Sequence, residues 1–135
     1  MQKNFVIDNG VALEGNHFYL DVHNCYSLID FEMNTKNGQS TISISFKKAE
    51  ECFLDGRPFN FRMSFLNISY FDCRGLFSKS IQDIELIGYK EIEDNDLSWL
   101  LEEKHFDINC CIVFLFNDDA YLKVQCEKIE LLEIG

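Results

Sequence analysis

The sequence predicts a mainly β, antiparallel fold of about eight strands, either a β-sandwich or a partly open barrel, with one short α-helix at about 95–104. Three observations lead to this class. Thirteen phenylalanines accompany a single proline, and aromatic side chains favour strands whereas proline interrupts them. Apolar and polar residues alternate with a period of two in most segments. Two Asn-Gly pairs separate such segments, and Asn-Gly is typical of tight hairpin turns.

The size and composition of the chain indicate one domain over residues 1–135. It contains no repeat, low-complexity tract or proline- or glycine-rich linker that would mark a boundary. Hydrophobic residues make up 47% of it, a share typical of a globular protein and not of a disordered one. A domain of this length is large enough to bury a core without metal ions or disulfides.

The first half of the chain is expected to form a hairpin and then a meander. Asn9-Gly10 joins the short arms 5–7 and 11–13. Three further strands follow in antiparallel order, with Asn37-Gly38 as the turn between the last two. The side chains expected to face the core at period two are Phe18, Leu20 and Val22, then Ile29, Phe31 and Met33, then Ile42, Ile44 and Phe46. A loop is expected at Asp55, Gly56 and Pro58.

The second half is expected to contain irregular strands and a final hairpin. In 60–71 the apolar positions change face near Phe65, which predicts a β-bulge or bend. In 81–92 we expect Ile84 and Leu86 to point inward and Gly88 to form a second bulge. The strand 108–116 is apolar on both faces, which is typical of a strand beneath a second layer. After a turn at 117–119, the last strand changes face beyond Lys128.

The only segment with helical spacing follows the 81–92 strand. Asp94, Asn95 and Asp96 provide side-chain oxygens suited to a helix N-cap. Leu97, Leu100 and Leu101 then recur at helical spacing. Glu102 and Glu103 lie at the C-terminal end, where the helix dipole disfavours acids, so we expect a short helix.

The net charge of −11 limits the kinds of partner. A surface this acidic repels nucleic-acid phosphates and anionic lipid headgroups, so we expect neither nucleic acid nor membrane as a partner. It attracts a basic protein and accelerates the encounter. The same charge also serves solubility, and both interpretations stay open. No apolar run is long enough to span a bilayer.

The six cysteines are interpreted as free thiols in the cytoplasm. No Cys-x-x-Cys pair is present, and the N-terminal residues lack the apolar core of a secretory signal peptide. Most of the cysteines are next to apolar residues, where a free cysteine behaves as a small hydrophobe. We therefore expect a cytoplasmic protein without disulfides.

Candidate chemistry is concentrated in "HFYLDVHNCY", residues 17–26. At period two, His17, Asp21 and His23 share one face of a strand, and two histidines with an aspartate could bind zinc or iron. The other interpretation is the solvated face of an antiparallel strand, which we favour. No phosphate loop, EF-hand or nucleophile motif is present. We expect no catalytic residue, cofactor or metal.

Two segments resemble a known class of protein. "FRMSFLNISYF" and the final hairpin "CIVFLFNDDAYLKVQCEKIEL" are similar to strands of small acidic all-β immunity proteins of bacterial polymorphic-toxin systems. The resemblance implies a stoichiometric inhibitor that occludes the active site of a cognate toxin, for example a basic nuclease.

The leading hypothesis is therefore a non-enzymatic module that binds a basic protein, such as a toxin domain, through an acidic surface. The predicted contact residues are Glu91, Glu93, Asp94, Asp96, Glu102, Glu103, Asp118 and Asp119. Two alternatives are retained: a small β-barrel that binds an apolar ligand in a phenylalanine-lined cavity, and a metal-dependent enzyme that uses His17, Asp21 and His23.

Overall fold

The computed structural model describes residues 1–50, 59–76 and 82–135. The described residues form ten strands, one short helix, α1 (Val22–Cys25), and one 3-10 turn, η1 (Glu103–His105). The strands are β1 (Gln2–Lys3), β2 (Val6–Asp8), β3 (Ala12–Glu14), β4 (Tyr19–Asp21), β5 (Tyr26–Lys36), β6 (Gln39–Lys48), β7 (Asn60–Arg74), β8 (Gln82–Glu91), β9 (Cys110–Phe116) and β10 (Tyr121–Ile134). The loop expected at Asp55, Gly56 and Pro58 lies outside the described residues.

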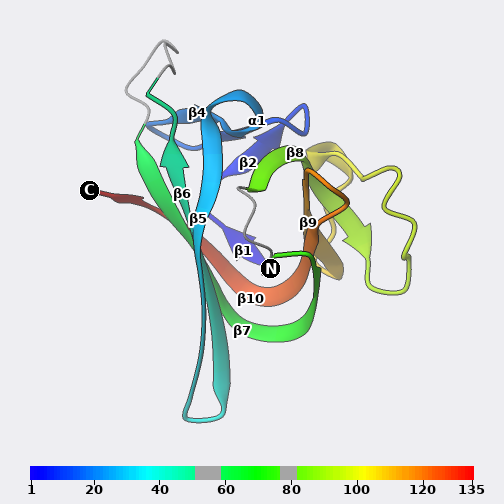
Figure 1. Ribbon diagram of the computed structural model, residues 1–135. Helices are drawn as coiled ribbons and strands as arrows, with labels where there is room; N and C mark the ends of the chain where they lie inside the picture. The colour runs from blue at the N-terminus through cyan, green and yellow to red at the C-terminus, as the bar shows by residue number, and fades with distance from the viewer. Residues whose placement is uncertain (51–58, 77–81) are drawn as a thin grey trace.

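The main sheet has the order β1-β10-β7-β6-β5-β8-β9, and β9 also pairs with β10. Strands β5 to β10 therefore close on themselves, and β7 and β10 curve beneath β9 (Figure 1). All pairings in the ring are antiparallel, whereas the short β1 lies parallel to β10. The contact between β5 and β8 is the shortest, because only Ser27 and Leu28 of β5 pair there. The prediction of a mainly β, antiparallel fold with little helix is confirmed.

A second, three-stranded sheet, β2-β3-β4, lies with α1 at one end of the ring (Figure 1). Its first hairpin turns at Asn9 and Gly10, whose φ angles are 51° and 72°, as the Asn-Gly signal predicts. The expectation that 16–22 begins the meander is wrong, because β4 pairs with β3 and not with β5. The helical turn α1 redirects the chain between them.

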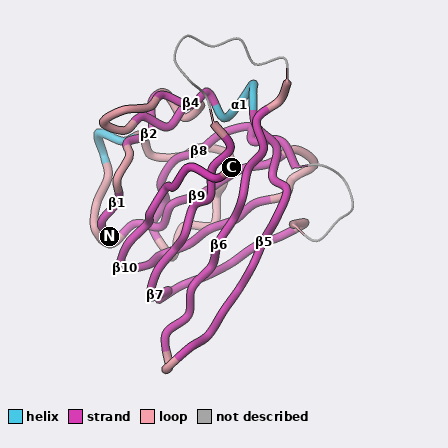
Figure 2. Tube along the Cα trace, turned by 90° about the vertical axis from the view of Figure 1, so that its left-hand side faces the viewer, coloured by secondary structure: helices cyan, strands magenta, loops and turns pink. Residues whose placement is uncertain are grey.

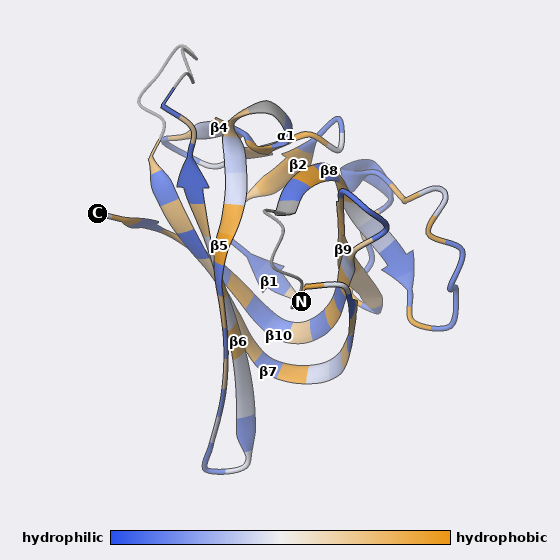
Figure 3. Cartoon of the chain, in the orientation of Figure 1, coloured by the Kyte–Doolittle hydropathy of each residue, from blue (hydrophilic) through white to orange (hydrophobic). Residues whose placement is uncertain are grey.

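The core lies inside the ring and contains most of the predicted inward side chains. Ile44, Phe46, Phe61 and Phe114 are fully buried, and the rings of Phe46 and Phe61 stack at 4.9 Å. Figure 3 shows the underlying alternation as hydrophilic and hydrophobic bands along β7 and β10.

The inward prediction is wrong for Ile29 and Met33 of β5, which are 57% and 54% exposed. Beyond its first residues, β5 forms with β6 a hairpin that projects from the body of the molecule (Figure 2). At Ile29 the register with β6 shifts between Leu28 and Asp30, so Leu28 takes the inward position opposite Phe46. Met33 pairs with the buried Ile42 but lies where the hairpin leaves the body of the molecule.

Two strands of the ring carry the irregularities that the sequence indicates. The register between β7 and β10 shifts at Gln125/Cys126, close to Asn67, which has a φ of 56°. The predicted change of face beyond Lys128 is confirmed, because Glu127 and Lys128 are both exposed and Ile129 is buried.

In β8 the irregularity lies elsewhere than predicted. The register shifts between Ile84 and Leu86, so that Ile84 and Ile87 are buried and Leu86 is only partly buried. Gly88 is therefore not a bulge. It lies where residues 100 and 101 pass over the strand, and a Cβ at this position would lie 2.6 Å from Cβ of Leu100.

The predicted helix at about 95–104 is wrong. Residues 92–102 form turns and irregular structure, and only η1 has a helical form. The side chain of Asp94 accepts a hydrogen bond from the amide of Asp96, and Asp96 accepts one from Ser98. Such local side-chain bonds compete with helical hydrogen bonding, and Leu100 and Leu101 lie against β8 instead.

Two further features of the structure bear on the expectation of a cytoplasmic protein without disulfides. Cys25 is disulfide-bonded, so the expectation of thiols that are all free is wrong. Cys73, Cys110, Cys111 and Cys126 are free, and Cys52 lies outside the described residues. Within the parts of the chain that the structure describes, no helix has the length and apolar character needed to cross a membrane.

Gly88 provides a test of how residues 100 and 101 lie on β8. We expect Gly88→Ala to lower the free energy of unfolding by about 1–3 kcal/mol, the usual range for overpacking. The added methyl would lie 2.9 Å from the carbonyl oxygen of Leu101 as well as against Leu100. Urea denaturation followed by fluorescence measures the change, and an unaltered midpoint would contradict the described packing.

Candidate functional site

Residues 91–109, here called the acidic segment, form a second layer on the outer face of β8, β9 and β10. In Figure 1 this segment lies beside the ring, at the right. Cys111 and Val113 are fully buried although they point away from the core, because the segment covers them. Leu101 exchanges two backbone hydrogen bonds with Tyr89 of β8, at 2.8 and 2.9 Å. The sequence prediction of a layer over β9 is correct, but the layer has almost no regular structure.

Two buried lysines hold the acidic segment against the sheet. Lys123 of β10 is 1% exposed, and its Nζ donates to the carbonyl oxygens of Ile92 and Asp94 at 2.8 and 2.9 Å. Lys90 of β8 is fully buried and donates to the carbonyl oxygen of Trp99 at 2.9 Å. Its Nζ also lies 3.3 Å from the carboxylate of Asp94. The two lysine ammonium groups thus donate hydrogen bonds to backbone carbonyl oxygens that would otherwise be paired with the amides of a neighbouring strand.

The indole of Trp99 is presented on the surface from this arrangement. Nζ of Lys90 lies 3.1 Å from the centroid of the ring, in a cation–π contact that fixes the indole from beneath. The side chain nevertheless stays 48% exposed. Tryptophan is one of the residue types enriched at protein-binding surfaces.

Glu103, at the start of η1, joins the acidic segment to the N-terminus. Its carboxylate accepts hydrogen bonds from Nζ of Lys3 at 2.8 Å, the amide of Ile7 at 2.8 Å and the hydroxyl of Tyr89 at 2.7 Å. Burial and the bond to Glu103 raise the pKa of the Tyr89 hydroxyl far above its usual value. The Lys3 side chain is 7% exposed and also lies against the Phe106 ring. The role of Glu103 is therefore structural, because its carboxylate binds groups of the N-terminal segment and of β8.

The other predicted contact acids have different environments. Glu91, Glu93, Asp96 and Glu102 are exposed on the acidic segment, whereas Asp94 is half-buried beside Lys90. Hydrogen bonds from Ser98 hold the pKa of Asp96 below its usual value. Asp118 and Asp119 are exposed on the β9–β10 turn, with φ angles of 58° and 60°. Most of the predicted acids thus lie on the surface.

Two pockets flank the acidic segment. One, of about 420 Å³, is lined by Glu91, Ile92, Glu93, Leu101, His105, Asp107, Asn109 and Cys110. The other, of about 860 Å³, lies between residues 95–98 and the ends of β7, β9 and β10 and is lined by Asp72, Arg74, Glu85, Asp119 and Tyr121 among others. Tyr121 donates to Asp72 at 2.9 Å, and this bond raises the pKa of the tyrosine.

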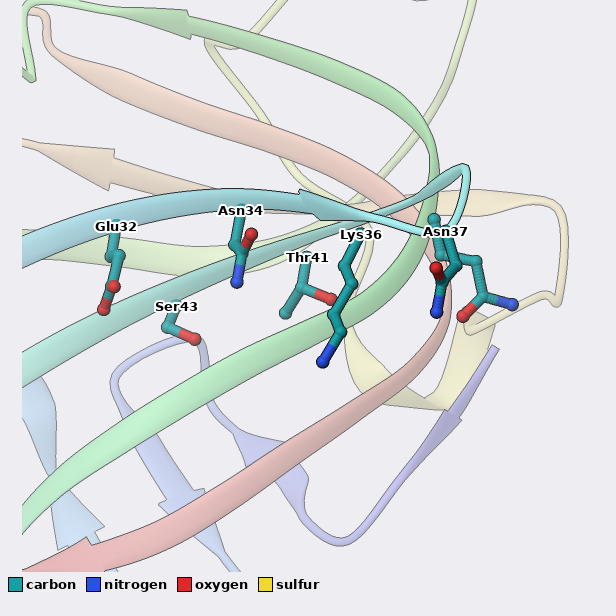
Figure 4. A pocket seen from close by; sticks show the side chains of 7 residues that line it. Glu32, Asn34, Lys36, Asn37, Thr41 and Ser43 are labelled. Atoms are coloured by element: carbon teal, nitrogen blue, oxygen red, sulfur yellow. The ribbon is translucent and has the colours of Figure 1, made fainter.

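A third pocket, of about 480 Å³, lies on the projecting β5–β6 hairpin and is lined by polar side chains alone. Glu32 and Asn34 of β5 and Thr41 and Ser43 of β6 point to the same side of the hairpin (Figure 4). Their register explains this, because Glu32 pairs with Ser43 and Asn34 with Thr41. The pocket carries both a carboxylate and the ammonium of Lys36, so it has no strong charge preference.

The structure does not bring the histidines of residues 17–26 into a metal site. His17 and Tyr19 are exposed, as expected for a solvated face. Asp21 ends β4, and His23 belongs to α1, where Nδ1 lies 3.0 Å from the carbonyl oxygen of Ile84. The described residues contain no group of three or more His, Cys, Asp or Glu side chains placed to hold a metal ion.

The apolar-ligand alternative also lacks support from the pockets described. Phe116 is the one phenylalanine that lines any of the three, and their other linings are largely polar. Comparisons with family models, curated proteins and solved structures find no match to this chain. Its function must therefore be argued from its own residues.

Sequence reasoning missed the basic half of this site. It placed the acids on the acidic segment but gave no role to Lys3, Lys90 or Lys123. The sequence does contain one sign of a buried lysine. Lys123 lies between Leu122 and Val124, opposite a strand that is apolar on both faces. A lysine beside a doubly buried strand needs acceptors nearby.

Proposed function

We propose that this protein is a non-enzymatic binding module that captures a basic protein through the acidic segment and the adjacent β9–β10 turn. The observation that carries the proposal is the half-exposed Trp99, whose indole lies over Lys90 close to Asp94 and Asp96. The same segment carries the exposed acids Glu91, Glu93 and Glu102. Carboxylates around an aromatic side chain combine charge-steered encounter with an apolar contact that slows dissociation. The net charge of −11 acts in the same direction.

Within this function, the specific role we propose is that of an immunity-type inhibitor, whose partner is a basic toxin domain of bacterial origin. Acids steer the partner to the surface, and the acidic segment then covers its active site. Such inhibition requires a surface that is already formed before binding. The buried lysines support this, because they order the acidic segment in the unbound protein and so reduce the entropy lost on association.

We further propose that the protein works in the cytoplasm and binds no nucleic acid. The charge supports the second point, because phosphates are repelled. The free thiols of Cys73, Cys110, Cys111 and Cys126 support the first point, whereas the disulfide at Cys25 opposes it, because disulfides persist mainly in oxidising compartments. Fractionation of cells that express the natural gene, followed by immunoblotting, tests the location directly, and recovery outside the cytoplasm would contradict it.

The proposed function predicts a charge-dependent complex with a basic protein encoded beside this gene. We expect Glu93→Lys combined with Glu102→Lys to reduce the association rate constant at least about tenfold at low salt, because steering is lost. Biolayer interferometry at low and high salt measures the rate. The control is Asp30→Lys combined with Glu32→Lys, an equal change of charge on two exposed acids of the β5–β6 hairpin.

The two variants separate local steering from total charge. The control should change the association rate less than about threefold, since its acids lie away from the acidic segment. Equal effects of the two variants would contradict a localised surface. The absence of a complex with the neighbouring basic protein would contradict the proposed function itself.

A further inference from the structure

The pocket beneath Glu91 and Glu93 has walls of two kinds. Its apolar part comes from Ile92, Leu101 and Cys110, its acids are Glu91, Glu93 and Asp107, and His105 and Asn109 complete the lining. No lysine or arginine among the described residues lines it. This distinguishes it from the other two pockets, whose acids are accompanied by Arg74 and Lys123 or by Lys36.

We propose that this pocket binds one arginine side chain of the basic partner. The inference rests on the proposed function and identifies the central contact of the proposed complex. An arginine has an apolar stem of three methylene groups and a planar guanidinium. Ile92 and Leu101 would contact the stem. The carboxylates of Glu91 and Glu93 would accept hydrogen bonds from the guanidinium, which binds carboxylates through two parallel bonds.

Charge and size both select this occupant. A purely apolar side chain would leave three carboxylates facing apolar surface, which is costly. A lysine would satisfy the charge but has no planar fork to engage two carboxylates at once. The volume of about 420 Å³ is at the small end of ligand pockets and suits one long side chain better than a large ligand.

The surroundings of the pocket are ordered and include an apolar rim. Gln125 of β10 donates to the carbonyl oxygen of Asn109 at 2.8 Å, and the side chain of Asp107 accepts a bond from the Asn109 amide at 2.8 Å. Ile108, which lies between Asp107 and Asn109 in the sequence, is 69% exposed. The neighbouring residues of the partner would bury this isoleucine once the arginine is seated.

The test is a titration of the whole ¹⁵N-labelled chain with the peptide acetyl-Gly-Arg-Gly-amide, followed by NMR. We expect saturable amide shifts centred on Glu93, Leu101 and Asn109. The matched peptide with citrulline, which keeps the shape but lacks the charge, should produce no saturable shift there. The lysine peptide should bind several-fold more weakly, because it lacks the planar fork.

Variants assign the binding to the pocket. Glu91→Gln combined with Glu93→Gln should weaken the arginine peptide about fivefold or more, as the loss of two charge-assisted contacts implies. Asp30→Asn combined with Glu32→Gln should leave its affinity unchanged. Both pairs are exposed on the surface, so neither substitution should affect folding.

Each outcome separates this inference from the proposed function. Shifts centred on the β9–β10 turn at Asp118, or equal affinity for the citrulline peptide, would overturn the arginine pocket. Capture of the neighbouring basic protein could then still succeed through the remaining acids. Conversely, a peptide seated in the pocket together with no capture of the basic protein would leave the pocket standing and overturn the proposed function.

Discussion

The Glu103→Gln variant should lose about 3 kcal/mol of unfolding free energy, because it leaves the ammonium of Lys3 without its counter-charge in a site that is 7% exposed. Glutamine keeps the length of the side chain and one acceptor oxygen. The amide of Ile7 and the hydroxyl of Tyr89 can therefore still be satisfied, and the change isolates the charge. Urea denaturation monitored by circular dichroism measures the loss.

Two further variants make this prediction specific. Glu102→Gln removes the adjacent acid, whose side chain is 66% exposed and pairs only with the exposed Lys104, and should change the stability by less than about 0.5 kcal/mol. Lys3→Met combined with Glu103→Gln should recover most of the loss, since it removes the stranded charge and keeps the volume apolar. A double variant as unstable as Glu103→Gln alone would contradict an origin in the buried charge.

Short-range signals explain why most of the fold could be predicted. Asn9-Gly10 specifies a turn through positive φ, and the alternation of Ile42, Ile44 and Phe46 specifies a buried face. Both depend on residues a few positions apart. Ile29 carries the same alternation but is exposed because the register with β6 shifts beside it, and Met33 is exposed because coverage of a face depends on where the distant strands end.

The site could be predicted only in part, because the acids that follow β8 are close together in the sequence, whereas Lys3 and Lys123 reach them from distant parts of the chain. A run of acids after β8 is visible in the sequence, and its exposure follows from its charge. Lys3 and Glu103 are separated by 100 positions, and no short-range pattern reports such a pair. The helix prediction failed at Asp94 and Asp96 for a related reason. The same oxygens that cap a helix also close local turns, and the contact with β8 favours the turns.

Lys123 holds two carbonyl oxygens of the acidic segment, and the Lys123→Met variant should loosen the segment without unfolding the ring. Methionine fills a similar volume but leaves the carbonyl oxygens of Ile92 and Asp94 without their donor. An unsatisfied buried acceptor costs about 1–3 kcal/mol. We therefore expect the amide of Asp94, which donates to the carbonyl of Glu91 at 3.2 Å, to exchange its hydrogen about 10- to 100-fold faster.

The matched control for this substitution is Lys128→Met on the same strand. Lys128 is 46% exposed and pairs with Glu130, so its loss should leave the exchange of the acidic segment unchanged. Amides within β10 should keep their protection in both variants, because the ring hydrogen bonds are untouched. Exchange at Asp94 that stays at the wild-type rate would contradict the anchoring role of Lys123.

The same variant connects the fold to the proposed function. If a preformed surface is what captures the basic partner, Lys123→Met should weaken the complex although the substituted side chain is 1% exposed in the unbound protein. The cost arises because the partner must then order the segment on binding. The association rate should change little, since the surface acids remain, whereas dissociation should accelerate. An unchanged dissociation rate together with faster hydrogen exchange would mean that the partner binds the loosened segment equally well.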